Sequence, residues 1–259
     1  LYTEEFNFSE SVQLTSNDAV YRISTDETSS LIEKYITNES TISLYTSLMH
    51  CIGKLDNVVE GTLMHEKMHL PIIPTIFSPS TNKDLLSQAV HALGGFPLIV
   101  KTRGGMHGVG VIQVDSLPAL SSLLDYFNSK KETVILRKYI PHTEQARLIV
   151  LGNKVIASHA NFVSTDFRTN AATRSDRKRS VKTYDDDINT IAVQAVQALG
   201  YECGGVDILF DTHTQTPYIA EVNFPCFFAR TQQMTGIDIS GAMIDFLIEK
   251  SNKKITLPL

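Results

Sequence analysis

Two apolar segments late in the chain decide how its fold is interpreted: Gly-Val-Asp-Ile-Leu-Phe at 205–210 and Tyr-Ile-Ala-Glu-Val-Asn-Phe at 218–224. Their composition predicts two β-strands joined by a polar turn, which together form a hairpin. Side chains two positions apart on a strand share a face, so Glu221 and Asn223 point the same way. If Asp207 pairs near Glu221 in this hairpin, three oxygen-bearing side chains converge on one face.

Such a group of oxygens has the chemistry of a metal site. Two carboxylates and an amide oxygen suit a hard cation such as Mg²⁺, which keeps part of its coordination shell for phosphate oxygens. Mn²⁺ is an alternative ion. The same three residues, Asp207, Glu221 and Asn223, also fit a solvated polar face of a hairpin. The pattern of this segment alone leaves both interpretations open.

The bulk composition excludes several classes of protein. With 259 residues, 42% of them hydrophobic, the chain can bury a substantial core. A net charge of −5 argues against a surface that binds nucleic acid along the whole chain. No apolar run is long enough to predict a membrane span. Three distant cysteines fit neither a zinc site nor a disulfide framework, which favours a reducing, cytoplasmic location.

Hydrophobic periodicity divides the chain into a small α/β start, a central unit with strands around a glycine-rich loop, and an antiparallel α+β unit. Helices are expected at 27–38, 57–69, 82–93, 117–127, 186–199 and 239–250. Strands are expected at 18–24, 97–101, 110–114, 133–139, 146–151 and 154–159, besides the hairpin described above. Clefts between such units are common places for ligands.

A glycine-rich loop follows the strand that ends at Lys101. Its glycines, four within seven positions, are Gly104, Gly105, Gly108 and Gly110. Glycines let backbone N–H groups approach an anion closely, so the loop is expected to cover phosphates, with His107 as a further phosphate contact. The spacing matches neither the Rossmann fingerprint nor the P-loop. A flexible turn with a solvated lysine is the alternative.

Three further polar segments are candidates for binding. Arg137-Lys138-Tyr139-Ile140 leaves a strand just before Pro141, and its backbone groups could bind an adenine edge; an ordinary strand exit fits equally well. Arg147 lies on a partly buried strand and therefore needs a partner. Arg168 and Asn170 follow, and the planar fork of an arginine suits phosphate or carboxylate.

A basic stretch at 174–182 carries five cations within nine positions: Arg174, Arg177, Lys178, Arg179 and Lys182. A solvated mobile loop explains it, and so does a clamp for an acidic substrate or for ATP phosphates. No Ser-His-Asp or Cys-His arrangement is visible, so covalent catalysis is not supported.

In their order along the chain, these motifs resemble the ATP-grasp superfamily, and most of all the RimK-like carboxylate–amine ligases, over roughly 18–250. That group includes bacterial glutathione synthetase and ligases that glutamylate or cyclise peptides. The resemblance implies an α+β (α/β) ATP-grasp fold, in which the nucleotide lies between two α+β subdomains. It assigns 1–53 to a partial N-terminal domain, 54–140 to the central subdomain and 141–259 to the C-terminal subdomain.

The resemblance also implies roles for individual residues. The metal ligands would be Asp207, Glu221 and Asn223. The residues that face the γ-phosphate and the acyl phosphate would be Arg147, Arg168 and Asn170. ATP would be bound by Lys54, Lys101, Gly104, Gly105, His107, Gly108, Arg137, Lys138, Tyr139 and Ile140.

The implied activity is ATP- and Mg²⁺-dependent formation of an amide bond through an acyl phosphate. Its substrate would be an amino acid or a peptide or protein side chain, with an acidic acceptor favoured by the basic stretch. Departures from the family pattern include Gln145, Ala160 and the 173–175 region. They motivate one alternative, an inactive ATP-binding regulatory module. The basic stretch at 174–182 motivates another, an ATP-independent protein that binds acidic peptides. A homo-oligomer is compatible with the sequence, whereas a membrane partner is not expected.

Overall fold

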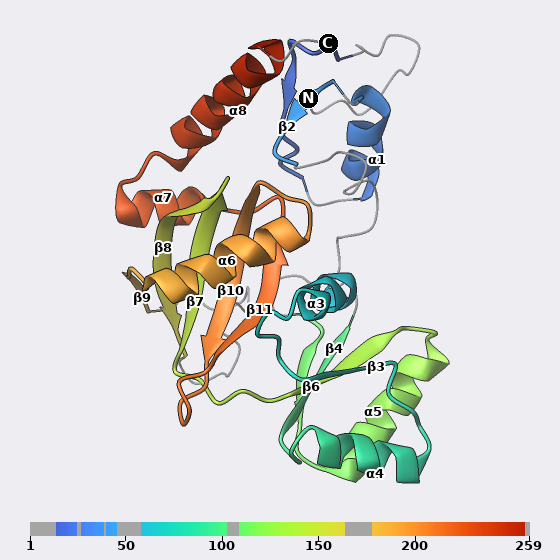
Figure 1. Ribbon diagram of the computed structural model, residues 1–259. Helices are drawn as coiled ribbons and strands as arrows, with labels where there is room; N and C mark the ends of the chain where they lie inside the picture. Colours follow the sequence, from blue (N-terminus) through green and yellow to red (C-terminus); the bar gives the residue numbers. More distant parts are fainter. Residues whose placement is uncertain are drawn as a thin grey trace.

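The computed structural model describes residues 14–24, 27–38, 40–45, 58–102, 109–163 and 178–256. Within these ranges the strands form a five-stranded, a four-stranded and a two-stranded sheet, and helices pack against them (Figure 1). The expected mixed α+β architecture is therefore confirmed. No helix in this described part of the chain is long and apolar enough to cross a membrane.

The four-stranded sheet has the order β3-β6-β4-β5 and is antiparallel throughout. Its elements are β3 (Thr75–Phe77), α4 (Lys83–Ala92), β4 (Leu98–Thr102), β5 (Val111–Val114), α5 (Leu117–Ser129) and β6 (Val134–Lys138). Leu98, Val100 and Leu136 point from the strands into the core formed with α4 and α5. Because side chains alternate along a strand, Lys101 and Arg137 project from the opposite face.

The five-stranded sheet has the order β11-β10-β7-β8-β9 and is also antiparallel. Its strands are β7 (Glu144–Leu151), β8 (Lys154–Phe162), β9 (Arg179–Val181), β10 (Cys203–Phe210) and β11 (Pro217–Asn223). Helix α6 (Asp186–Ala198) covers one face, where it packs on Leu148, Val150 and Val206 (Figure 1). The opposite face packs on α7 (Ala229–Thr235) and α8 (Ile239–Thr256), and it also carries Arg147 and Asp207.

One expectation about the chain needs correction, and one helix was not expected. The end of the basic stretch is not a loop, because Arg179–Val181 pairs with β8 as the strand β9. The Arg179 guanidinium donates a 2.7 Å hydrogen bond to Asn161. Helix α7, which lies between the hairpin and the last helix, was not expected from the periodicity, because it spans only seven residues.

Helix α3 (Val58–Lys67) packs against the five-stranded sheet, although it precedes the four-stranded one in sequence. His65 Nε2 lies 2.9 Å from the carbonyl oxygen of Ala195 in α6. After the helix, the chain runs beside β11, where the Ile219 N–H donates to the Pro71 carbonyl at 2.8 Å. This arrangement places α3 at the edge of β11, close to the functional site described below (Figure 1).

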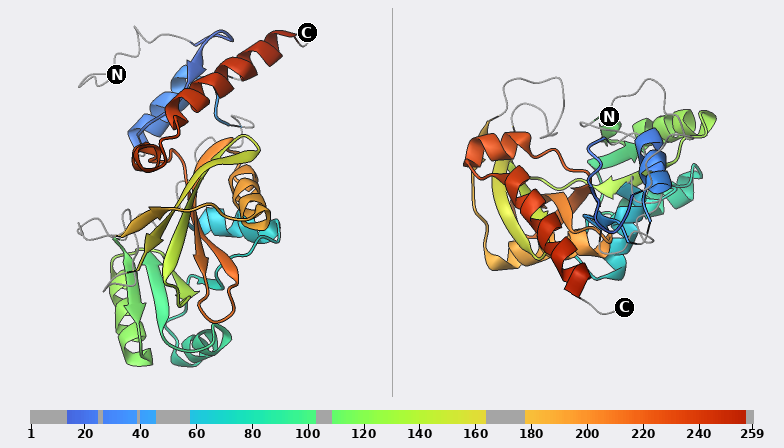
Figure 2. Two further views of the ribbon diagram at one scale, coloured as in Figure 1. Left: turned by 90° about the vertical axis from the view of Figure 1, so that its left-hand side faces the viewer. Right: turned by 90° about the horizontal axis from the view of Figure 1, so that it is seen from above.

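The first described elements are β1 (Ala19–Val20), α1 (Glu27–Ile36) and β2 (Ile42–Ser43). Strand β2 docks against α8, where the Lys250 ammonium donates 2.8 Å hydrogen bonds to the carbonyls of Ser43 and Tyr45 (Figure 2). The Tyr45 ring contacts Phe224, which directly follows β11. The structure therefore ties this part of the chain to the C-terminal sheet. The domain boundaries at 53 and 140 remain predictions.

Candidate active site

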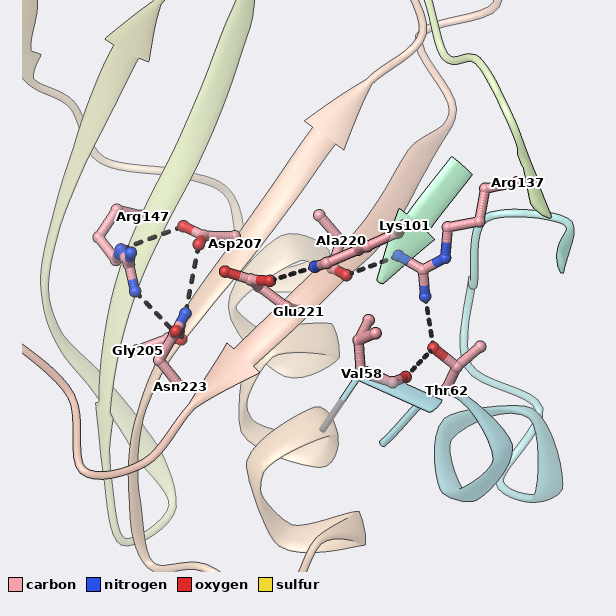
Figure 3. Close-up of polar contacts among 10 residues, drawn as sticks. All are labelled: Val58, Thr62, Lys101, Arg137, Arg147, Gly205, Asp207, Ala220, Glu221 and Asn223. Carbon is pink, nitrogen blue, oxygen red and sulfur yellow. Dashed lines mark hydrogen bonds and ion pairs between the residues drawn. The ribbon is translucent and has the colours of Figure 1, made fainter. Parts of the chain in front are cut away.

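The β10–β11 hairpin brings together the three residues predicted to bind a metal. Asp207 pairs directly with Glu221, as the sequence predicts, and Gly205 pairs with Asn223. The Asn223 amide nitrogen lies 3.3 Å from Asp207 Oδ2 (Figure 3). The three side chains therefore share one face of the sheet.

An irregularity in β11 makes this arrangement compatible with the core. Ile208 pairs with Ile219 and Asp207 pairs with Glu221, so Ala220 has no partner residue on β10 and forms a β-bulge. In a regular ladder, Ile219 and Glu221 would share a face. The bulge instead lets Ile219 pack in the core beneath α6 while Glu221 faces the site.

Asp207 lies at the buried end of the site. Its side chain is fully buried and forms an ion pair with Arg147 Nε, 3.0 Å from Oδ1. Burial raises the pKa of Asp207 to about 6, although Arg147 opposes the shift. Gly205 leaves room for this pair, because a Cβ at that position would lie 2.7 Å from Arg147 Nη1. The expectation that Arg147 needs a partner is confirmed.

Glu221 connects the two large sheets. Its carboxylate accepts a 2.6 Å hydrogen bond from the Lys101 ammonium at the end of β4 (Figure 3). Burial by itself raises the pKa of Glu221, but Lys101, together with Arg147 and Arg137, outweighs it and lowers the pKa to about 2. Glu221 is therefore held as a carboxylate between cations from both sheets.

A cavity of about 110 Å³ opens beside this ion pair, between the two sheets. Ile99 and Val111 line it from one sheet, and Leu209 lines it from the other. At its charged end are Lys101 and Glu221. The remaining lining residues are Ile73, Arg137, Lys138, Tyr139, Ile140, His142, Gln145 and Ala220. An apolar slot with a charged end suits a ligand that has a flat ring at one end and an anionic group at the other.

The segment between β6 and β7 borders this cavity and joins the two sheets. Lys138 is the last residue of β6 in the four-stranded sheet, and its N–H donates to the Pro74 carbonyl at 3.0 Å. His142 Nδ1 lies 2.7 Å from the Ile140 carbonyl oxygen. All four residues predicted to bind adenine, Arg137, Lys138, Tyr139 and Ile140, therefore line the cavity, and the Arg137 guanidinium also hydrogen-bonds to Ala220 and Thr62.

Several predicted site residues lie outside the described residues. These are Lys54, Gly104, Gly105, His107, Gly108, Arg168 and Asn170. The residues that the structure does describe contain no group of three or more His, Cys, Asp or Glu side chains that could hold a metal ion. The candidate set thus consists of two carboxylates and one amide.

Sequence reasoning missed parts of the site. Gln145 had been noted only as a departure from a family pattern, yet it is buried, lines the cavity and lowers the pKa of Asp207 by hydrogen bonding. Its position two residues before Arg147 on one strand could have placed it on this face. Ile99 and Leu209 had been assigned only to strands, because nothing local distinguishes cavity-lining from core side chains.

Comparison with known proteins identifies the family of the chain. The model of the RimK-like ATP-grasp domain matches residues 61–247. The chain belongs to the RimK-like ATP-grasp family. The resemblance inferred from the motifs is thereby confirmed, and the domain covers both large sheets.

Individual relatives support the same assignment. A probable α-L-glutamate ligase of Klebsiella pneumoniae (strain 342) is 29% identical over 200 residues. A ribosomal protein bS6–L-glutamate ligase of Salmonella paratyphi B is 30% identical over 200 residues. In both comparisons the match covers 76% of this chain and 64% of the relative, so the chain spans less than two thirds of these proteins.

Solved structures confirm the ATP-grasp fold. The ATP-grasp ligase PsnB, in complex with a minimal precursor, Mg and ADP, superimposes with a TM-score of 0.64. That match has 16% sequence identity and covers 86% of this chain and 66% of PsnB.

Proposed function

We propose that this chain forms the ATP-binding part of an ATP- and Mg²⁺-dependent carboxylate–amine ligase. The observation that carries the proposal is the contact between Lys101 and Glu221. It joins the two sheets at the charged end of an apolar cavity, next to Asp207, Asn223 and Arg147. An acidic and a basic group held together between two subdomains suit a ligand that brings both a metal ion and phosphates.

The cavity supports an orientation for ATP. Its apolar walls, including Ile99 and Leu209, would enclose the adenine, and the backbone of 138–140 would hydrogen-bond the edge of the ring. Lys101 would then contact the α- and β-phosphates at the charged end. In this orientation the γ-phosphate points toward Arg147. Lys54 and the glycine-rich loop are expected to complete the phosphate contacts.

The residues present fit a magnesium ion. Asp207 Oδ1 is buried and accepts no hydrogen bond within the described structure, although Arg147 offsets part of its charge. The neighbouring donors, the Glu221 carboxylate and the Asn223 amide, are hard oxygen ligands. Bound there, Mg²⁺ would neutralise charge that develops on the phosphate oxygens.

The reaction would then proceed in two steps. A carboxylate oxygen of the substrate attacks the γ-phosphorus, and the bond to the β-phosphate oxygen breaks to release ADP. An amine nitrogen next attacks the carbonyl carbon of the acyl phosphate, losing a proton as phosphate leaves. The protein positions the groups and offsets charge, through Lys101 and Arg147, and supplies no nucleophile.

The relatives support a class of substrate. Those named above are an α-L-glutamate ligase and a ligase that acts on ribosomal protein bS6. We infer that this chain joins an amino acid to a peptide or protein, and that the basic residues near 174–182 favour an acidic acceptor.

ADP release tests the proposal when it is measured over pairs of amino acids and acidic peptides, with the amide product identified by mass spectrometry. We expect release to require Mg²⁺ and both substrates. Glu221→Ala should reduce it at least 100-fold, about 3 kcal/mol of transition-state stabilisation. Glu202→Ala, which removes the carboxylate of an ion pair with Lys250, is the matched control and should retain activity. Unchanged turnover in Glu221→Ala would refute the metal assignment. Nucleotide binding without any amide product would instead indicate a regulatory module.

A further inference from the structure

Arg137 is a buried cation whose side chain leaves its own sheet. Its backbone belongs to β6, between β3 and β4, but only 4% of the residue is exposed. Nη1 donates a 3.0 Å hydrogen bond to the carbonyl of Ala220, and Nη2 donates to the hydroxyl of Thr62 (Figure 3). One guanidinium thus joins the four-stranded sheet to β11 and to α3.

The contact with Thr62 is fixed in direction. The Thr62 hydroxyl donates its only hydrogen to the Val58 carbonyl at 2.6 Å, so it meets Arg137 as an acceptor. Helix α3 itself is held against α6 through His65 and Ala195. Thr62 is therefore a rigid anchor, which belongs to the packing unit of the five-stranded sheet.

The contact with Ala220 falls on the bulge. Ala220 is the residue of β11 that has no partner on β10, and the bulge decides that Glu221 faces the site while Ile219 enters the core. A bulge leaves backbone groups outside the regular ladder, and these groups need another partner. Arg137 supplies that partner for the carbonyl directly before Glu221.

This arrangement is electrostatically costly. Burial lowers the pKa of Arg137 to about 10, and the more distant Glu221 only partly offsets the effect. Among the described residues, no carboxylate lies within ion-pair distance of Arg137. Its Nε is buried without a hydrogen-bond partner. Because an unpaired buried cation is a poor source of stability, its geometry points to a functional use.

We propose that Arg137 is a positioning residue that holds the Ala220 bulge and thereby fixes the Glu221 carboxylate where Lys101 and the metal ion meet it. This inference rests on the proposed function, because Glu221 is a metal ligand only there. It differs from the expectation that Arg137 contacts adenine. Here the guanidinium positions the metal ligand Glu221 and does not contact the base.

The two roles are separated by measuring ADP affinity as Mn²⁺ is varied, and again in the presence of a chelator. Mn²⁺ should increase the affinity for ADP, and we expect the Mn²⁺ concentration at which this increase is half-maximal to rise about tenfold in Arg137→Met. This change corresponds to the loss of one hydrogen bond from a charged donor. Metal-free ADP affinity should change less than about threefold, because the cavity wall is retained. Thr62→Val, which removes only the anchor, should raise the Mn²⁺ requirement by about threefold.

A double-mutant cycle with Glu221→Gln provides the decisive readout. If Arg137 acts through Glu221, adding Arg137→Met to Glu221→Gln should change the Mn²⁺ requirement little further. Thermal unfolding checks that the variants fold. If Arg137→Met does not fold, Arg137→Lys replaces it in the same cycle, since it keeps the charge but cannot contact both partners.

Three outcomes would overturn the inference. One is an Mn²⁺ requirement that does not change in the Arg137 variant, and another is effects of Arg137 and Glu221 that simply add. The third is an equal loss of ADP affinity with and without metal, which would make Arg137 a nucleotide contact. These results leave the proposed function intact. If the wild-type chain binds ADP no more tightly with Mn²⁺, the proposed function fails and this inference fails with it.

Discussion

Asp207 and Glu221 lie directly opposite each other on neighbouring strands, yet their surroundings differ in kind. Asp207 is fully buried, and its partner Arg147 comes from the same sheet. Glu221 remains partly exposed, and its partner Lys101 comes from the other sheet. Burial raises the pKa of Asp207 to about 6, whereas Lys101 and the two arginines bring that of Glu221 to about 2.

The two carboxylates therefore depend on different groups to stabilise their charges. The charge on Asp207 is disfavoured by burial, and Arg147 from the same sheet offsets it only in part. The charge on Glu221 is stabilised mainly by Lys101, which reaches it from the four-stranded sheet. A metal ion would therefore relieve the first carboxylate, whereas it would compete with Lys101 for the second.

The largest expected effect is a difference in sign between two neutral substitutions in the metal-free protein. At pH 7, Glu221→Gln should lower the free energy of unfolding by about 1–2 kcal/mol, because it removes a favoured charge. Asp207→Asn should leave it unchanged or raise it by about 1 kcal/mol, because burial disfavours the Asp207 charge more than Arg147 favours it. Urea denaturation measures both. Equal destabilisation of both variants would refute the claim that the protein favours the charge on Glu221 and disfavours the charge on Asp207.

The pH dependence of stability sharpens the same contrast. Asp207 has a raised folded-state pKa, from 3.8 to about 6, so the native state holds its proton longer than the unfolded state does. Its contribution to stability therefore falls as the pH rises from about 4 to 6 and is constant above that. Relative to Asp207→Asn, the metal-free wild-type protein should lose stability across this window in denaturation at several pH values. If the difference in the free energy of unfolding between wild type and Asp207→Asn did not vary with pH, the raised pKa of Asp207 would be contradicted.

Glu221 should show the opposite trend at lower pH. Its folded-state pKa falls from 4.5 to about 2, so the stability that it contributes is present above about 4.5 and is lost as the pH drops toward 2. Comparison of wild type with Glu221→Gln in the same experiment serves as the internal control.

The smallest effect is expected for Lys101→Met. This substitution removes the contact between the sheets without touching the Asp207–Arg147 pair. Both Lys101 and Glu221 are partly exposed, so the loss of stability should be about 1 kcal/mol or less, and it should shrink further in high salt. Denaturation at low and high ionic strength measures it. A loss of several kcal/mol would show that the two sheets depend on this pair for their stability.

Local patterns in the sequence predicted the hairpin and the convergence of Asp207, Glu221 and Asn223, because strand pairing and a two-residue period fix which side chains share a face. The need of Arg147 for a partner followed from burial alone. The order of Lys101 and the later motifs predicted the family, which the comparisons confirm.

Other features depend on contacts between distant segments, and no local pattern encodes them. The bulge at Ala220 reflects a conflict between core packing by Ile219 and the placement of Glu221. The bridge from Arg137 to Thr62 joins residues that are 75 positions apart. The strand β9 lies at the end of a stretch whose charge suggested a loop, because pairing with β8 outweighs composition there.

A crystal structure of the chain with Mg²⁺ and ADP would show whether the metal ion and the nucleotide bind at this site. We expect the metal about 2.1 Å from oxygens of Asp207 and Glu221, with the Asn223 amide oxygen turned toward it. The adenine should lie in the cavity between Ile99 and Leu209. A metal ion bound away from these carboxylates, or a nucleotide outside the cavity, would contradict this expectation.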